Sequence, residues 1–247
     1  WSSASIRSTC LRSANSIRLQ LPSPSLDHVG AHVRTNSPNA TVVPTALAFG
    51  LALGLLAGIA QAQTAPSTTQ ARPGRAAAPE RRAITAERLH DDEKVVFDGL
   101  LTEPFWTRAG KADNFIQQDP SNGEPATEKT EVAVVYDDEA LYIGAICYDS
   151  DPKGWLGYER RRDQTLGSDD RFQWVLDPYM DAQNGYFFEI NPSGLMGDGL
   201  ISATSSQNRN WDGIWDLRVR HTEIGWTLEI KIPFRTLNFD RNRTEWG

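Results

Sequence analysis

The feature that most constrains this fold is a pair of short apolar runs separated by turn-forming residues. The runs are Phe172–Leu176 and Tyr186–Ile190, and both are rich in aromatic or β-branched residues. An Asp-Pro and an Asn-Gly pair lie between them, and the Asn-Pro-Ser-Gly sequence at Asn191–Gly194 follows. Such residues turn a chain because they fix φ or tolerate positive φ. The segment therefore predicts consecutive antiparallel strands, which is typical of an all-β fold.

Period-two patterns occur in both directions from this segment. Apolar residues alternate over 132–136 and 141–147, on either side of a polar turn at 137–139. Two further apolar faces are predicted, one formed by Trp211, Gly213, Trp215, Leu217 and Val219, and the other by Trp226, Leu228, Ile230 and Ile232. No window keeps a 3.6-residue period, so we expect helix only as a turn near Glu103–Trp106.

Alternating strands at short intervals predict an antiparallel β-sandwich between Val95 and Gly247. Side chains that alternate along a strand fall on one face, and that face packs into the core. We expect Val134, Ile143, Trp174, Phe188, Leu228 and Ile230 to be among the buried residues.

The first part of the chain has no core-forming pattern and is divided by an apolar run. Residues 45–60 carry no charge, and Ala-Gln-Ala follows at 60–62. The run suits a signal peptide, whereas a spanning helix needs about 20 apolar residues. We therefore interpret 1–44 as a non-domain extension and 45–62 as the signal peptide core and cleavage site. Residues 63–88 are interpreted as a disordered linker, and 89–247 as a C-terminally truncated sandwich domain.

Export and charge limit the partners of this domain. From Leu89 onward there are 16 Lys and Arg residues against 29 Asp and Glu residues, which gives 16 − 29 = −13. This excess repels phosphate backbones and argues against nucleic acid. Cys147 would have no disulfide partner after cleavage, which favours a bacterial envelope protein over a disulfide-stapled one. We expect the periplasm, outer membrane or cell surface.

No motif in the chain identifies a catalytic centre. The sequence lacks Gly-x-Ser-x-Gly, His-Glu-x-x-His and a phosphate-binding glycine loop with lysine. The pairs Asp169/Asp170 and Asp212/Asp216 could serve glycoside hydrolysis, but neighbouring acids are common in so acidic a domain. Whether the chain is an enzyme is left open.

Two ligand hypotheses arise from residue types alone. Asp177, Asp181 and Asn184 crowd a turn where oxygen ligands could hold calcium, and the simpler interpretation is that these side chains bond nearby backbone amides. Haem would need axial ligands such as Met180 or Met196 with His221. Their spacing does not favour haem.

Four stretches together resemble the family 9 carbohydrate-binding module of bacterial envelope proteins. They are Val96–Trp106 with its Asp-Gly, Val135–Ile143, Asp169–Asp177 with Phe188–Gly194, and Trp211–Trp215 with Gly225–Phe234. The resemblance covers about Val95 to Gly247. It implies the same β-sandwich, a carbohydrate ligand and a link to polysaccharide breakdown or uptake, with O-glycosyl hydrolysis as the associated activity. It also implies a C-terminal β-barrel or catalytic region outside this chain.

The resemblance places a sugar site near the loop before Asp169. The clamp tryptophan of the family is replaced at Leu166 and Gly167, its glutamate by Gln173 and its arginine by Glu189. Trp155 is the nearest upstream ring that could replace the clamp, so the expected ligand-binding residues are Trp155, Arg162, Asp170 and Gln173. These replacements leave two alternatives, a docking domain of an outer-membrane protein that binds no sugar and a haem-binding electron-transfer sandwich.

Overall fold

Short antiparallel strands form nearly all the regular structure of the chain. The computed structural model describes residues 17–20, 82–202 and 207–247, and these residues belong to one compact unit. The elements in chain order are β1 (Ile17–Gln20), β2 (Arg82–Thr85), β3 (Glu87–Arg88), α1 (Pro104–Arg108), β4 (Lys111–Ala112), β5 (Thr130–Tyr136), β6 (Ala140–Tyr148), β7 (Phe172–Leu176), β8 (Gly185–Ile190), β9 (Met196–Ile201), β10 (Gln207–Asn208), β11 (Asp216–Thr222), β12 (Gly225–Pro233), the 3-10 turn η1 (Phe234–Thr236) and β13 (Glu245–Trp246).

The strands form two main sheets and a small third one. One main sheet has the order β11-β12-β6-β5-β3, with β4 also pairing β5. It is antiparallel except for β3, which runs parallel to β5. The second has the antiparallel order β10-β9-β8-β7. The third has the order β13-β1-β2.

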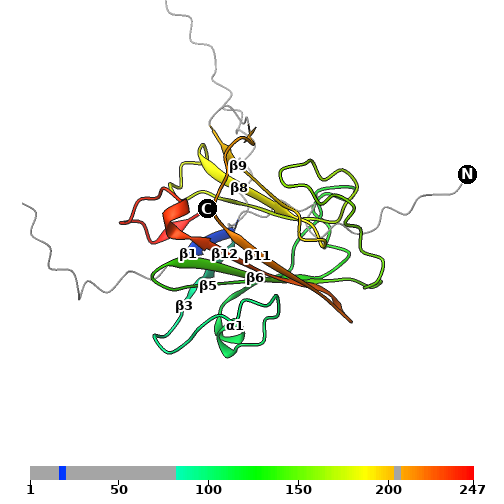
Figure 1. The fold of residues 1–247 in the computed structure, drawn as a ribbon, viewed down its shortest axis with the longest axis horizontal. Helices are drawn as coiled ribbons and strands as arrows, with labels where there is room; N and C mark the ends of the chain where they lie inside the picture. Colours follow the sequence, from blue (N-terminus) through cyan, green and yellow to red (C-terminus); the bar gives the residue numbers. More distant parts are fainter. Residues whose placement is uncertain (1–16, 21–81, 203–206) are drawn as a thin grey trace, which may run out of the picture. The chain divides into compact units, whose positions relative to one another are not determined.

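The two main sheets pack face to face around one hydrophobic core (Figure 1). Phe188 of β8 is fully buried and lies edge-on to Trp215, with ring centroids 5.3 Å apart. Of the six residues expected in the core, Val134, Ile143, Phe188, Leu228 and Ile230 are buried. Trp174 is only half-buried, because it lies on β7 at the end of its sheet. The predicted β-sandwich is therefore confirmed.

A second, smaller core lies on the outer face of the β5–β6 sheet, under α1. Phe105 and Trp106 of α1 are buried there against strand residues such as Val135 and Tyr142. Glu229 of β12 is fully buried on this face, and its Oε2 accepts the backbone N–H groups of Asp98 and Gly99 at 2.9 and 2.8 Å. The helix confirms the expected turn near Glu103–Trp106.

The strand predicted to begin at Trp211 begins only at Asp216. The backbone of Gly213 instead bonds to side chains, because its N–H donates to Asp198 and its C=O accepts from Arg162. Those two bonds replace ladder hydrogen bonds, so the 211–215 segment is not a strand. The matching face of Trp226, Leu228, Ile230 and Ile232 is buried on β12 as predicted.

The predicted domain boundary at Leu89 is too late in the chain. Residues 82–88, assigned to the linker, form β2 and β3, and β3 adds to the main sheet. Residues 17–20, assigned to the extension, form β1 between β2 and β13. These strands have only two to four residues, which is too short for an alternating pattern to show in the sequence. The 45–62 segment lies outside the described residues, and no helix among those described is long and apolar enough to span a membrane.

Candidate functional site

The long loop between β6 and β7, residues 149–171, is held in place by buried polar side chains. Asp169 accepts the backbone N–H of Glu159 at 2.9 Å and the side-chain amide of Asn191 at 2.9 Å. Asn191 is fully buried, and its amide also donates to the Glu159 carbonyl at 2.7 Å. The Asn-Pro turn after β8 therefore fixes the shape of this loop.

Asp170, one of the expected ligand-binding residues, has a structural position. It is buried and accepts the backbone N–H of Leu156 at 2.8 Å, while its own N–H donates to the Leu156 carbonyl at 2.9 Å. Burial raises the pKa of Asp170 to about 6, and the charges of Asp149 and Asp169 add to the rise. This side chain holds the loop rather than facing solvent.

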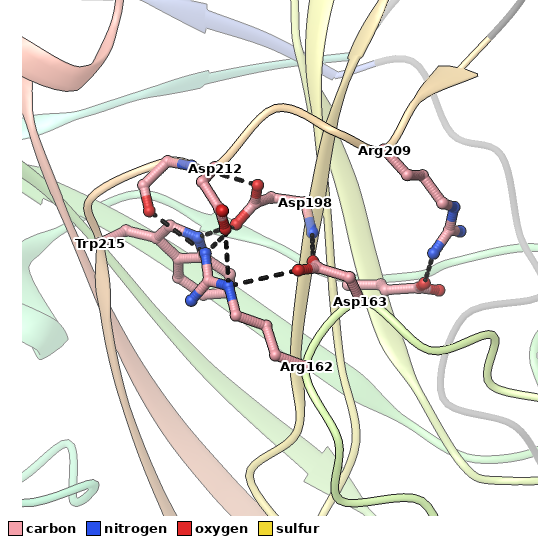
Figure 2. Close-up of polar contacts among 8 residues, drawn as sticks. Arg162, Asp163, Asp198, Arg209, Asp212 and Trp215 are labelled. Carbon is pink, nitrogen blue, oxygen red and sulfur yellow. Dashed lines mark hydrogen bonds and ion pairs between the residues drawn. The ribbon is translucent and has the colours of Figure 1, made fainter.

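Arg162, from the same loop, is the centre of an ionic network at the edge of the β9 strand (Figure 2). Its guanidinium group pairs with Asp198, contacts Asp212 at 3.2 Å and Asp163 at 3.5 Å, and donates to the Gly213 carbonyl at 3.2 Å. The Arg162 side chain keeps 38% of its surface exposed. The fold thus holds one cation in a fixed orientation while leaving part of it open to solvent.

Asp198 is the buried anchor of this network. It is fully buried on β9, where it accepts the indole N–H of Trp215 at 2.8 Å and the Gly213 N–H at 3.2 Å. Burial raises the pKa of Asp198, and these donors with the Arg162 charge act in the opposite direction. A buried carboxylate needs such partners because desolvation penalises its charged form.

An aromatic ring lies beside the network. Trp211 is half-buried, and its ring packs against Tyr186 at a centroid distance of 5.1 Å. A Cβ on Gly213 would lie 2.8 Å from the Trp211 ring, so this glycine lets the ring lie directly against the backbone that Arg162 contacts. Asp212, between them, keeps 78% of its side chain exposed. Arg162, Trp211 and Asp212 thus form one surface, which we call the Arg162 surface.

Trp155 lies in a different set of contacts. It is half-buried, and its ring packs on that of His221 at a centroid distance of 4.2 Å. Nε2 of His221 also lies 2.9 Å from the Pro192 carbonyl. The contacts that the structure gives Trp155 and Arg162 share no residue.

Gln173 points to the outer face of the β7–β8 sheet, opposite to the core. It is exposed and lies directly across from Glu189 in the strand register. Glu189 is buried and accepts from Arg209 at 2.7 Å, while the Arg209 guanidinium lies 5.2 Å from the Phe187 ring centroid. Among the contacts of the described residues, none joins the Gln173 side chain to Trp155 or Arg162, whereas Asp170 bonds the backbone of Leu156, the neighbour of Trp155.

The proposed calcium residues are used within their own turn. The Asp177 carboxylate oxygens accept the backbone N–H groups of Tyr179, Asp181 and Ala182, and Asp181 accepts those of Gln183 and Asn184. The Asn184 amide also donates to Asp181 at 2.8 Å. No group of three or more His, Cys, Asp or Glu residues in the described ranges could hold a metal ion. These bonds are the ones that the simpler interpretation, turn stabilisation, describes.

The haem hypothesis finds no support in the positions of its proposed ligands. The His221 ring is engaged by Trp155 and Pro192, as above. Met180 lies in the turn after β7, where a Cβ on Gly247 would come within 3.6 Å of its sulfur, and Met196 lies on β9. Among the contacts of the described residues, none joins either methionine to His221.

Sequence reasoning identified Arg162 and missed its partners. Asp198 follows a glycine in a short strand, and nothing in its neighbourhood distinguishes a buried anchor from an exposed acid. The signal that could have found the site is the unusual Trp-Asp-Gly-Ile-Trp run at Trp211–Trp215, which supplies Trp211, Asp212 and the Trp215 indole.

Comparison with solved structures finds three matching chains, among them two carbohydrate-binding modules. They are a family 9 carbohydrate binding module from Caldicellulosiruptor kristjanssonii in complex with cellotriose and the same kind of module in complex with glucose. Each is 14% identical to this chain, with a TM-score of 0.40. The match to the cellotriose complex covers 60% of this chain and 66% of that structure. The match to the glucose complex covers 62% of this chain and 72% of that structure. These values establish neither a shared family nor a shared ligand. No family model matches the chain, and no curated protein matches it.

Proposed function

We propose that this domain binds carbohydrate, and that the Arg162 surface is its binding site. The observation that carries the proposal is the combination of a fixed, partly exposed guanidinium group with an exposed carboxylate and a half-buried indole. Arginine and aspartate bond pairs of sugar hydroxyls in a planar geometry. An indole ring offers the apolar face on which sugar C–H groups stack. Prearranged polar groups of this kind are what a small-molecule site requires.

The rigidity of the surface supports binding over a purely structural role. Arg162 is held by acceptors from two segments, β9 and the 211–215 segment, so little side-chain freedom is lost when a ligand binds. Asp212 contributes little to folding, since most of its side chain is exposed. A carboxylate that the fold does not need is available for a ligand.

The wider role follows from the export signal predicted by the sequence. We propose that the domain holds glycan chains for polysaccharide breakdown or uptake at the bacterial envelope, next to a catalytic or β-barrel region. The alternative is a docking domain that binds no sugar. The replaced clamp positions at Leu166 and Gly167 favour this alternative.

Glycan titration of the 1–247 chain tests the proposal. Cello-, xylo- and chito-oligosaccharides would be added while tryptophan fluorescence and heat are recorded. We expect dissociation constants of roughly millimolar order, because one stacking ring and a few hydroxyl bonds give about 4 kcal/mol. Absence of heat and of a fluorescence change with all three glycans would favour the docking alternative.

Two variants locate the site. Asp212→Asn should weaken binding about fivefold, the effect of one lost charge-assisted bond of about 1 kcal/mol. Asp216→Asn is the matched control, because Asp216 is also an exposed acid, four positions away on β11. Trp155→Ala tests the position expected from the sequence, and a loss there with unchanged Asp212→Asn affinity would move the site to the His221 side of the loop.

A further inference from the structure

The Arg162 surface carries more negative than positive charge (Figure 2). The Arg162 guanidinium group pairs with three carboxylates, those of Asp163, Asp198 and Asp212. One cation against three anions gives a net charge of 1 − 3 = −2, and the sum stays negative if the buried Asp198 is protonated. The charge of Arg162 is therefore balanced within the fold, and the surface as a whole repels anions.

The neighbouring arginines do not reverse this balance. Arg161 pairs with Glu159 at 3.0 Å, so its charge is matched within the loop. Arg160 is exposed, and no contact among the described residues joins its side chain to Arg162 or to the three carboxylates. From Leu89 onward the net charge of the chain is 16 − 29 = −13, which adds a weaker repulsion of the same sign.

Two polar atoms of the surface are left for a ligand. Nε and Nη2 of Arg162 bond to Asp212, Asp198 and the Gly213 carbonyl. In the part of the chain that the structure describes, Nη1 of Arg162 and Oδ2 of Asp212 make no hydrogen bond. Because Nε of Arg162 lies 3.2 Å from Oδ1 of Asp212, this donor and this acceptor belong to neighbouring groups, within reach of one sugar unit.

We propose that the Arg162 surface prefers glycans with protonated amines, such as 2-amino-2-deoxy sugars, and rejects glycans with carboxylates. The preference rests on the proposed function, carbohydrate binding at this surface, and specifies the class of sugar. An ammonium group has donors and no acceptor, so Oδ2 of Asp212 is its partner. The hydroxyl group on the neighbouring carbon accepts from Nη1 of Arg162. The face of the Trp211 indole also attracts an ammonium group on a sugar that stacks there.

A carboxylate on the sugar fits the same surface poorly. It would accept from Nη1 of Arg162 with the Asp212 carboxylate beside it, and repulsion between like charges offsets the gain. A neutral hydroxyl group in place of the amine keeps the bond to Asp212 and lacks the charge attraction. The expected order of affinity is therefore amine, then hydroxyl, then carboxylate.

Three β-1,4-linked tetrasaccharides that share their ring configuration and differ in charge test the proposal on the 1–247 chain. They are the tetramers of 2-amino-2-deoxyglucose, of glucose and of glucuronic acid. Calorimetric titration at about pH 6 keeps the amine charged, because amines of the α-amino type have pKa values of about 7.7–8.0. We expect the amino tetramer to bind about fivefold more tightly than the glucose tetramer, and the uronic tetramer about fivefold more weakly. Salt at about 1 M should remove most of both differences, because it screens exposed charges.

Two variants locate the selectivity. Asp212→Asn should lower the preference for the amino tetramer over the glucose tetramer to about twofold or less. Asp216→Asn removes the same charge from an exposed position on β11 and should keep the parent preference. A preference that both variants lower equally would come from the net charge of the domain and would overturn the proposal.

The outcomes separate the preference from the proposed function. Equal affinity for the three tetramers, or tightest binding of the uronic tetramer, would overturn the preference and leave carbohydrate binding in place. Absence of heat with every tetramer would overturn both.

Discussion

Three buried carboxylates show how differently this fold treats the same chemical group. Burial raises the pKa of Asp170, Asp198 and Glu229. Asp198 alone has a cation, Arg162, among its direct partners, whereas Asp170 and Glu229 accept only backbone N–H groups in the described contacts. We therefore expect loss of the Arg162 cation to destabilise the domain, and neutralisation of Glu229 to relieve a destabilising charge at neutral pH.

Removing the cation should destabilise the domain. Arg162→Ala leaves Asp198 buried without its charge partner, which typically costs about 3–5 kcal/mol in a fully buried pair. Because Arg162 is partly exposed, solvent reduces the expected loss to about 2 kcal/mol. Urea unfolding at neutral pH measures it. Arg161→Ala is the control, since that neighbour is more exposed and pairs only with Glu159, and its effect should stay within about 0.5 kcal/mol.

The single variant Asp198→Asn and the double variant Arg162→Ala with Asp198→Asn complete a double-mutant cycle. If the cost arises from the unpaired acid, neutralising Asp198 should recover about half of the loss. Additive losses in the double variant would contradict this interpretation of the network.

Glu229 should make the domain less stable as pH rises. Burial, with the nearby Glu103 and Asp98 charges, raises its pKa from 4.5 to about 7. Between those two values the folded state holds more protons than the unfolded state, so the stabilisation is complete below pH 4.5 and is lost as pH rises through 7. The loss is at most about 3 kcal/mol.

Unfolding of Glu229→Gln at about pH 6 and 8 checks the sign, because Asp170, with a pKa of about 6, titrates in the parent chain and in the variant alike. The parent chain should lose stability between these values, and the variant should lose clearly less. Glu139→Gln, at an exposed turn position, is the control and should keep the parent slope. An equal slope in Glu229→Gln would assign the pH dependence to other groups.

At the scale of elements, the packing of α1 depends on a glycine, Gly144, in the sheet beneath it. A Cβ on Gly144 of β6 would lie 2.7 Å from Leu101 and 2.8 Å from the Trp106 ring. Gly144→Ala should therefore displace α1 and lower stability by about 1–3 kcal/mol, the usual cost of overpacking. Thermal unfolding measures it. Gly167→Ala, where a Cβ would meet nothing within 4 Å, should leave the midpoint unchanged, and equal shifts in both variants would contradict the packing argument.

The strands that sequence predicts well are those with one buried face. In strands β5, β6, β8 and β12, apolar residues alternate with polar ones or form continuous runs. Their side chains enter the core, and burial there requires apolar residues. Strands β1 and β2 have four residues each, two of them polar, and β3 has only Glu87 and Arg88. Segments this short are held by backbone pairing and leave little pattern in the sequence. The 211–215 segment has strand-like alternation, but two side-chain bonds to Gly213 replace its ladder.

The candidate site was predictable only in part for a related reason. Trp155 is the one tryptophan of the turn-rich 149–171 loop, whereas Arg162 is one of its four arginines. The contacts of Arg162 with Asp198 and Asp212 join positions 36 and 50 residues away. No local pattern encodes such distances, because register and loop shape decide them after the sheets form.

At the scale of the whole molecule, the first described strand is the element most at odds with the predicted processing. Strand β1 lies between β2 and β13, and its Leu19 is buried opposite the fully buried Trp246. Cleavage after Ala62 would remove β1 from the domain. The exported form would then leave the facing edges of β2 and β13 unpaired and expose the side of Trp246 that Leu19 covers.

A variant that lacks residues 1–20 measures what β1 contributes. We expect a stability loss of about 2–4 kcal/mol, from a buried leucine and the backbone bonds on both sides of the strand. Tryptophan emission should shift to the red as Trp246 gains contact with water, and Trp246→Phe in the same background should remove most of that shift. The control lacks residues 1–16 and retains β1, so it should unfold at the parent midpoint. If both deletion variants unfold at the parent midpoint with unchanged tryptophan emission, β1 contributes nothing to the stability of the sandwich. Cleavage before Gln63 on export would then leave the stability of the domain unchanged.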